Sequence, residues 1–338
     1  MLLRDIPFEP VSNASGGRNF FGEGYWFHGT WNALSAAFRL VGVKAALQYE
    51  GANFVAKTTT LNKKPGNMPL VGDTTTPKEL IPKCIKVLPK HRAVLNKVGL
   101  SGPGLERLLN IGQWQTRTRP FFLSYMATGQ TLEEKLADTR VFATLLATKL
   151  SGFNTLIGLQ VNFSCPNVDH GQKPDGHQES LIYEVGSTLD ILAAALPQVP
   201  LVPKFSVELH PAIAVKIAQH PALDALVVSN TVPWLKFKDR IDWQGIFGTD
   251  QSPLKDLEGP GGGGLSGTPI FPLMLEWVGQ ARQAGLKKPI IACGGILSPD
   301  DVRMVADAGA SGIEVGSASI LCPWNVQSII DEGRRRFR

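Results

Sequence analysis

Short apolar runs alternate with amphipathic stretches along this chain from about residue 50 onward. Runs rich in β-branched and aromatic residues are typical of strands, and apolar residues that recur at helical spacing indicate helices. We predict eight strands, at residues 54–58, 94–100, 121–126, 156–163, 201–206, 225–229, 290–293 and 312–315. Because helical stretches separate the strands, the pattern favours repeated βα units around a parallel sheet.

Two of the predicted helices carry start signals. Thr131 and Glu134 stand at the spacing of a capping box, in which each side chain binds the backbone N–H of the other residue. Ser298 precedes Pro299, which places an N-cap before a proline at the first helical position. Within residues 181–196 the apolar side chains recur on one helical face, which is typical of a face buried in a core.

The positions of the glycines distinguish two architectures that share this alternation. Eight strands separated by helices suit either a closed barrel or a doubly wound open sheet. In the open dinucleotide-binding sheet the glycine motif follows the first strand, whereas here glycines gather late, at 261–267, 294–295 and 316. Barrels commonly bind phosphate with the loops after their last two strands. We therefore predict a single (β/α)₈ TIM barrel that binds a phosphate-bearing cofactor.

Three regions fall outside the simple alternation. We interpret residues 1–50 as an N-terminal extension that packs on a barrel formed by residues 51–338. Its segment 26–43 is rich in large apolar residues, and a helix that covers the barrel explains this as well as a helix on a membrane surface does. Residues 74–94 form one insertion, and residues 232–265 form a second, which is long enough to be a lid or a binding segment.

Composition narrows the class of protein. The chain has 338 residues, of which 43% are hydrophobic and 19% are charged, so it is able to bury a large core. The net charge of +5 comes partly from a short basic tail, and no basic stripe with interleaved aromatics suggests a nucleic acid partner. Four scattered cysteines and six histidines show neither metal-ligand spacing nor a disulfide framework. We expect a cytoplasmic protein without a metal.

The segment 160–168 holds side chains suited to a ring substrate, at the end of a predicted strand. Asn162 and Asn167 are each able to donate and accept hydrogen bonds, which suits the edge of an imide or amide ring. Cys165 lies between them and could remove a proton as a thiolate. The alternative is a structural cysteine in a tight turn, but the flanking asparagines favour a functional site.

The sequence Asn-Phe-Ser-Cys-Pro-Asn at 162–167 resembles the substrate-loop motif of the dihydroorotate dehydrogenase family. Six further segments resemble motifs of the same family in the same order, over roughly residues 50–320. They are 51–60 with 64–67, 96–100, 229–231, 263–267, 294–295 and 316–318. A single such motif is a weak signal, whereas seven in order are specific.

This resemblance implies an FMN-dependent oxidation of (S)-dihydroorotate to orotate, a step of de novo pyrimidine synthesis. Substrate C6 would deliver a hydride to flavin N5 while Cys165, as base, takes the C5 proton. The implied substrate-binding residues are Lys57, Asn96, Gly99, Leu100, Asn162, Asn167, Asn230 and Thr231. The implied flavin-binding residues are Lys57, Thr58, Ser124, Asn162, Lys204, Ser229, Gly267, Gly294, Gly295, Gly316 and Ser317.

The electron acceptor and the assembly stay open at this point. A cysteine base resembles class 1 of the family, in which some homodimers use fumarate and others use NAD through an iron–sulfur partner subunit. We expect a homodimer and an acceptor that is fumarate, a quinone or NAD. The chain departs from the family's pattern at Ser101-Gly102, where Pro-Asn is usual, and at Glu314, where a glutamine-like residue is commoner. An FMN barrel with another dihydropyrimidine or enone substrate, or a non-catalytic flavin-binding interaction protein, is the alternative.

Overall fold

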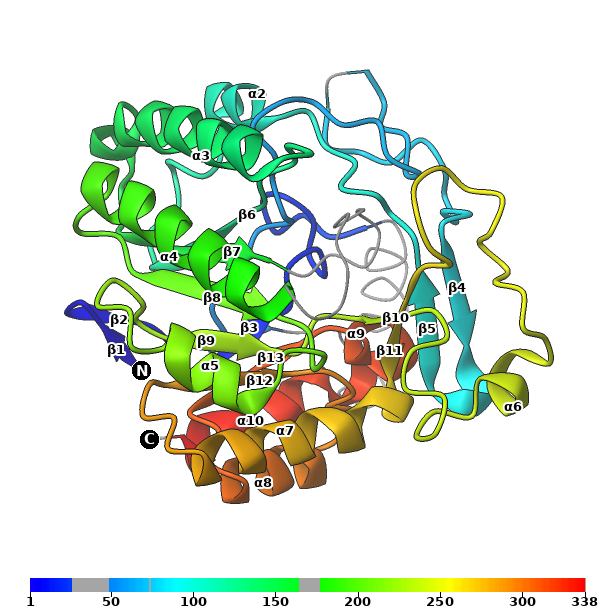
Figure 1. Cartoon of the computed structure of the whole chain (residues 1–338). Coiled ribbons are helices and arrows are strands. Elements are labelled where there is room, and N and C mark those ends of the chain that lie inside the picture. Colours follow the sequence, from blue (N-terminus) through cyan, green and yellow to red (C-terminus); the bar gives the residue numbers. More distant parts are fainter. Residues whose placement is uncertain (26–48, 73, 164–176, 338) are drawn as a thin grey trace, which may run out of the picture.

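A curled parallel sheet forms the centre of the molecule (Figure 1). The computed structural model describes residues 1–25, 49–72, 74–163 and 177–337. Along the sheet the strands are β3 (Val11–Asn13), β13 (Gly312–Val315), β12 (Ile290–Cys293), β9 (Leu226–Val228), β8 (Leu201–Phe205), β7 (Ile157–Asn162) and β6 (Phe121–Tyr125). Every pairing between neighbours in this sheet is parallel, as the alternation of strands and helices predicts.

Residues 53–59 join the two edges of this sheet. The edge strand β3 meets them through a parallel bridge between Ser12 and Asn53, and the other edge strand, β6, meets them through parallel bridges at Val55 and Thr59. This segment therefore serves as the eighth strand and closes a (β/α)₈ barrel, which confirms the predicted architecture.

The prediction that residues 94–100 form a barrel strand was wrong. Residues 94–100 overlap β5 (Ala93–Asn96), which belongs to a separate four-stranded antiparallel sheet. The order in that sheet is β10 (Val232–Pro233), β11 (Gly264–Gly267), β5 and β4 (Ile85–Leu88). The barrel position goes instead to β3, which is too short for its periodicity to be recognised and which lies inside the predicted extension. The domain boundary at residue 50 itself stays a prediction.

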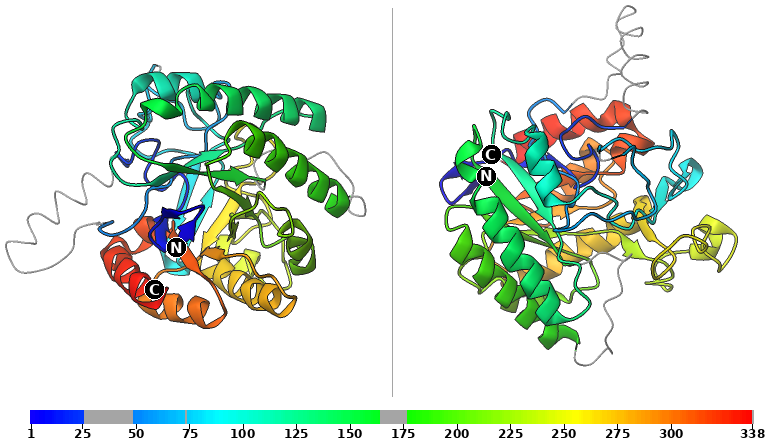
Figure 2. Two further views of the ribbon diagram at one scale, coloured as in Figure 1. Left: turned by 90° about the vertical axis from the view of Figure 1, so that its left-hand side faces the viewer. Right: turned by 90° about the horizontal axis from the view of Figure 1, so that it is seen from above.

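Helices surround the barrel sheet (Figure 2), except α6, which lies beside the antiparallel sheet in Figure 1. They are α2 (Leu105–Ile111), α3 (Leu132–Ala147), α4 (His177–Ala195), α5 (Pro211–Ile217), α6 (Trp243–Phe247), α7 (Phe271–Gln283), α8 (Pro299–Asp307), α9 (Ala318–Leu321) and α10 (Val326–Arg336), with 3-10 turns η1 (Pro89–His91), η2 (Leu150–Gly152), η3 (Thr268–Ile270) and η4 (Pro323–Asn325). The capping box of Thr131 and Glu134 is present, and the Ser298 side chain caps α8. In the described ranges, no helix combines the length and the apolar character needed to cross a bilayer. The segment 26–43 lies outside those ranges.

The hairpin of β1 (Leu2–Leu3) and β2 (Ile6–Pro7) fills one end of the barrel. Leu3, Ile6 and Phe8 form a buried cluster with side chains of the barrel strands, most of them near the strands' beginnings, and the centroid of the Phe8 ring lies 4.2 Å from that of Phe122, on which it stacks. In Figure 1 this hairpin and the antiparallel sheet lie at opposite ends of the barrel. The carboxyl ends of the strands, where barrel enzymes keep their active sites, therefore face the antiparallel sheet.

Candidate functional site

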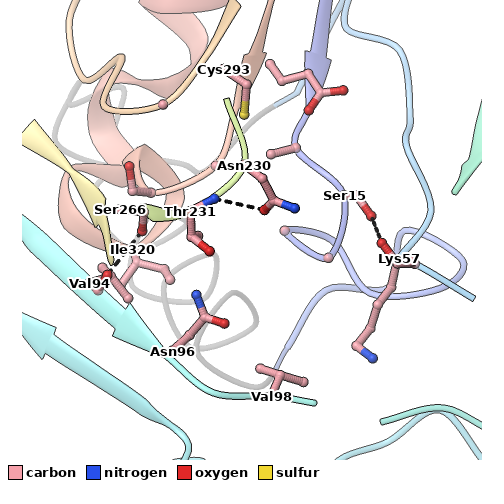
Figure 3. A pocket seen from close by; sticks show the side chains of 18 of the residues that line it. Ser15, Lys57, Val94, Asn96, Val98, Asn230, Thr231, Ser266, Cys293 and Ile320 are labelled. Atoms are coloured by element: carbon pink, nitrogen blue, oxygen red, sulfur yellow. Dashed lines mark hydrogen bonds between the residues drawn. The ribbon is translucent and has the colours of Figure 1, made fainter. Parts of the chain in front are cut away.

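A cavity of about 260 Å³ lies between the carboxyl ends of the barrel strands and the antiparallel sheet (Figure 3). Most of the predicted site residues line it. These are Lys57, Thr58, Asn96, Gly99, Leu100, Asn162, Lys204, Ser229, Asn230, Thr231, Gly294, Gly295, Gly316 and Ser317. Polar groups from several strand ends that converge on one concave surface are typical of a barrel's binding site.

Of the predicted residues that the structure describes, two do not line this cavity, and two further predicted residues are not described. Cys165 and Asn167 lie outside the described residues, so their roles stay predictions. Ser124 lies behind the wall, where its Oγ is 3.0 Å from Thr58 Oγ1. Gly267 does not line the cavity either; its φ is 100°, and an added Cβ would collide with the carbonyl oxygen of Arg92. The need for glycine there is explained by close backbone packing.

Three asparagine side chains from separate elements reach the cavity. Asn162 ends β7, and its Oδ1 accepts a hydrogen bond of 3.1 Å from Nδ2 of Asn230, which follows β9. The Asn230 Oδ1 accepts from the backbone N–H of Thr231 at 2.9 Å. Asn96 ends β5, and its Nδ2 donates to the carbonyl oxygen of Gly264 at 3.3 Å. In Figure 3 Asn96 and Asn230 project toward the same space, so together they present neutral donors and acceptors to a ring.

Lys57 brings a cation to the same cavity. Its side chain is buried, its Nζ donates to the carbonyl oxygen of Ser101, and the ammonium lies 4.7 Å from the centroid of the Phe20 ring. A cation over an aromatic face is favourable, and these contacts fix the lysine beside residues 98–101, which we name the cavity turn. The next residue, Thr58, hydrogen bonds through its hydroxyl to Ser15 Oγ at 2.9 Å.

The cavity turn owes its shape to left-handed backbone and to Ser101. Gly99 and Leu100 have φ values of 69° and 60°. Ser101 Oγ donates to the carbonyl oxygen of Val98 and accepts from the backbone N–H of Met68, both at 3.0 Å. The residue that departs from the family's motif therefore fixes the turn by hydrogen bonds, where the commoner proline would fix its own φ.

A buried ion pair forms another part of the wall. Lys204 lies in β8, and its Nζ is 2.7 Å from Oε2 of Glu314 in β13; the two side chains are 6% and 1% exposed. The other carboxylate oxygen, Oε1, accepts a hydrogen bond from Nε2 of Gln160, and Cys293 Sγ lies 3.7 Å from Lys204 Nζ. Four strands thus place one cation, one anion, one amide and one thiol in contact.

Burial and neighbouring charges act in opposite directions on Lys204. Burial alone would lower the pKa of the ammonium, but the Cys293 sulfur, which is a thiolate at the alkaline pH where the lysine titrates, and the Glu314 carboxylate more than offset it, so this pKa lies above its ordinary value. Burial raises the pKa of the Cys293 thiol to about 12, so the sulfur is neutral near pH 7. The Glu314 carboxylate is therefore the acidic group paired with Lys204 in this cluster.

Several residues of the wall were not predicted. They include Ser15, Gly16, Tyr25, Ser266, Cys293 and Glu314. Ser15 and Gly16 follow β3, the strand that was missed. Cys293 and Glu314 lie at or next to the carboxyl ends of correctly predicted strands, a position that could have indicated them.

The wall fits the phosphate-bearing flavin that the resemblance implies. Gly294 and Gly295 adopt φ values of 128° and 72°, which glycine tolerates readily, and such turns direct backbone N–H groups toward an anion. These turns, with Gly316 and Ser317, would hold the phosphate, and Lys204 would lie near the ring. Within the described ranges, no group of three or more His, Cys, Asp or Glu side chains is placed to hold a metal ion.

Comparisons with known proteins agree with this arrangement. The family model for dihydroorotate dehydrogenase matches residues 34–336. Dihydroorotate dehydrogenase A (fumarate) of Lactobacillus delbrueckii subsp. bulgaricus is 31% identical over 229 residues, which cover 67% of this chain and 66%, just under two thirds, of the relative. The catalytic subunit of dihydroorotate dehydrogenase B (NAD(+)) of Anoxybacillus flavithermus is 28% identical over 279 residues, which cover 82% of this chain and 76% of the relative.

The crystal structure of ligand-free DHODH from Eimeria tenella has the same fold. It superposes with a TM-score of 0.62 at 20% identity, over 96% of this chain and 83% of that chain. The matched family model spans most of the sequence, and the fold agrees with it. This chain belongs to the dihydroorotate dehydrogenase family.

Proposed function

We propose that this protein is a dihydroorotate dehydrogenase that oxidises (S)-dihydroorotate to orotate, in de novo pyrimidine synthesis, with FMN as its bound cofactor. One observation carries the proposal. The asparagines, lysines and glycines that the family resemblance singles out come from separate strands and loops, yet those in the described part of the chain line one cavity, apart from Gly267. The stability of a barrel depends on its core and on the end formed by the amino termini of the strands, so folding alone does not require these residues to meet at the carboxyl ends.

In this proposal the asparagines hold the pyrimidine ring. Asn96, Asn162 and Asn230 are neutral, and each offers both a donor and an acceptor, which matches the alternating N–H and C=O groups at the edge of the ring. Lys57 pairs with the substrate carboxylate, since an ammonium and a carboxylate form a charge-assisted hydrogen bond. The substrate is thereby oriented by groups that add little charge near the reacting carbons.

Oxidation of dihydroorotate removes a proton from C5 and a hydride from C6 and leaves a double bond between these carbons. We assign the proton to the Cys165 thiolate, which follows Asn162, the last residue of β7, by three residues in the sequence. When bound, FMN supplies the hydride acceptor, N5. The Lys204 ammonium, whose charge its partner Glu314 offsets in large part, would lie near the ring on which reduction creates negative charge.

The proposed cycle ends when an external acceptor takes the two electrons. Relatives of this chain are named for fumarate and for NAD(+), and a quinone is the third candidate. Reoxidation of the reduced protein by each acceptor, measured alone and after addition of an iron–sulfur partner subunit for NAD, distinguishes these routes. The cytoplasmic location and the homodimeric state remain predictions.

Orotate binding tests the substrate assignment without turnover. We expect orotate to perturb the absorbance spectrum of the oxidised flavin at saturable, micromolar to millimolar concentrations, because the ring would stack beside it. Asn230→Ala should weaken that binding by about tenfold, through the loss of about one to two hydrogen bonds. A bound flavin whose spectrum orotate leaves unchanged would favour another dihydropyrimidine or enone substrate.

A further inference from the structure

The Glu314 carboxylate is a cavity residue with no assigned role in the proposed reaction. It lies in β13, lines the cavity, and is 1% exposed, and its Oε2 is 2.7 Å from Lys204 Nζ. Taking two opposite charges out of water is costly, and a buried ion pair is often no more stable than apolar residues of similar size. Stability is therefore a weak reason for this pair, and its position on the cavity wall suggests a role in the site.

The Glu314 carboxylate is held by hydrogen bonds at both of its oxygens. Oε2 accepts from Lys204, and Oε1 accepts from Nε2 of Gln160, so both carboxylate oxygens receive a hydrogen bond. Because Gln160 directs its Nε2 toward Glu314, its own buried Oε1 has no hydrogen-bond partner among the described residues. The Gln160 amide thus donates a hydrogen bond to the carboxylate, while its own carbonyl oxygen accepts none from the described residues.

The pair also determines the charge that Lys204 presents to the cavity. Cys293, whose Sγ lies 3.7 Å from the Lys204 ammonium, is a neutral thiol near pH 7. The contact of 2.7 Å pairs the Lys204 ammonium with the Glu314 carboxylate. A lone lysine would present a full positive charge at this wall, whereas the pair presents a dipole of nearly zero net charge.

We propose that Glu314 is a positioning residue that holds the Lys204 ammonium and lowers the reduction potential of the FMN bound in this cavity. The inference rests on the proposed function only in requiring FMN at this site. Reduction adds negative charge to a flavin, which a nearby cation stabilises and a nearby anion opposes. Because the pair is desolvated, the charge of Glu314 acts at an effective dielectric constant far below that of water.

The test is the midpoint potential of the bound flavin. Glu314→Gln keeps the shape of the side chain and an oxygen that accepts from Lys204, but it removes the charge. We expect the equilibrium constant for two-electron reduction to rise about tenfold or more, which corresponds to a potential about 30 mV higher. Glu314→Asp keeps the charge and should restore most of the wild-type potential. Glu332→Gln is the matched control, because Glu332 pairs with Arg335 on α10, away from the cavity wall.

Reduction is carried out chemically against a reference dye, so that the result does not depend on dihydroorotate. An unchanged potential in flavin-loaded Glu314→Gln, or an equal shift in Glu332→Gln, overturns the proposal. If the wild-type protein holds FMN but dihydroorotate does not reduce it, the proposed function fails while the effect of Glu314 is still measured.

If Glu314→Gln does not retain FMN, the free energy of unfolding of the apo-protein tests whether Glu314 holds the Lys204 ammonium. The glutamine variant leaves a buried ammonium without its anion, so it should be less stable than Lys204→Met/Glu314→Gln, which removes both charges. A double variant no more stable than Glu314→Gln would show that the carboxylate does not hold the ammonium, and would refute the proposal.

Discussion

Replacement of Gly66 by alanine should damage the proposed substrate site through the cavity turn. Gly66 has a φ of 51°, and a Cβ added there would stand 2.5 Å from the carbonyl oxygen of Val98 and 2.8 Å from that of Gly99. It would also collide with the Ser101 hydroxyl. Gly72 is a matched control, because its φ is 53° and an added Cβ meets no atom of the described residues within 4 Å.

The magnitude follows from these distances. Both alanines pay about 1 kcal/mol for left-handed backbone. At Gly66, ordinary contact at 3.4 Å further requires the cavity turn to move by about 0.6 to 0.9 Å, the difference between 3.4 Å and the two distances of 2.8 and 2.5 Å. Such overpacking costs about 1–3 kcal/mol more. A displacement near 1 Å in a positioning element lowers kcat/KM by up to about 100-fold.

The assay combines kcat/KM for dihydroorotate with flavin content and urea unfolding of both variants. We expect Gly66→Ala to lose about 2–4 kcal/mol of unfolding free energy and at least tenfold in kcat/KM. Gly72→Ala should lose about 1 kcal/mol and keep wild-type kinetics. Equal kcat/KM in the two variants, at equal flavin content, would refute the placement of the cavity turn in the substrate site.

Three further predictions concern the proposed base, the reactivity of the thiols and the β1–β2 hairpin that fills one end of the barrel. Cys165→Ser should slow flavin reduction by dihydroorotate by at least about 100-fold at neutral pH, since a hydroxyl is a poorer base, and stopped-flow traces at the wild-type rate would exclude this role. Iodoacetamide at pH 8 should modify Cys165 well before Cys293, whose pKa burial raises to about 12; mass spectrometry of equal labelling would contradict this. Phe8→Ala should lower the free energy of unfolding in urea by about 3–5 kcal/mol, because Phe8 is 2% exposed, whereas Leu2→Ala, at a residue that is 65% exposed, should lower it by less than about 1 kcal/mol. Equal losses in the two variants would argue against the packing of this hairpin and Phe8 into the end of the barrel.

The fold was predictable from the sequence where strands are long and periodic. The predicted strands from residue 121 onward all contain observed barrel strands, because their apolar runs are bounded by turns and separated by helices. β3 was missed because a three-residue strand has no measurable period, and its pairing with β13 is decided by closure of the barrel. Residues 94–100 have strand character, but sequence alone does not tell which sheet such a segment joins.

Individual residues of the candidate site were predictable where they belong to sequence motifs. Lys57, Asn96 and Asn230 reach the cavity as predicted, although their roles remain proposals. The pairing of Lys204 with Glu314 was not predicted, because it depends on strands that are far apart in the chain and meet only in the closed barrel. Such contacts follow from register and closure, which local patterns do not encode.

The most direct test of the central claim is an anaerobic titration of the purified protein with dihydroorotate, followed by the flavin absorbance near ~450 nm. We predict a yellow protein whose flavin bleaches with dihydroorotate and forms orotate in equal amount. A yellow protein that does not bleach would contradict the dehydrogenase activity while leaving a flavin barrel in place. A colourless protein that does not take up FMN would contradict the cofactor assignment as well.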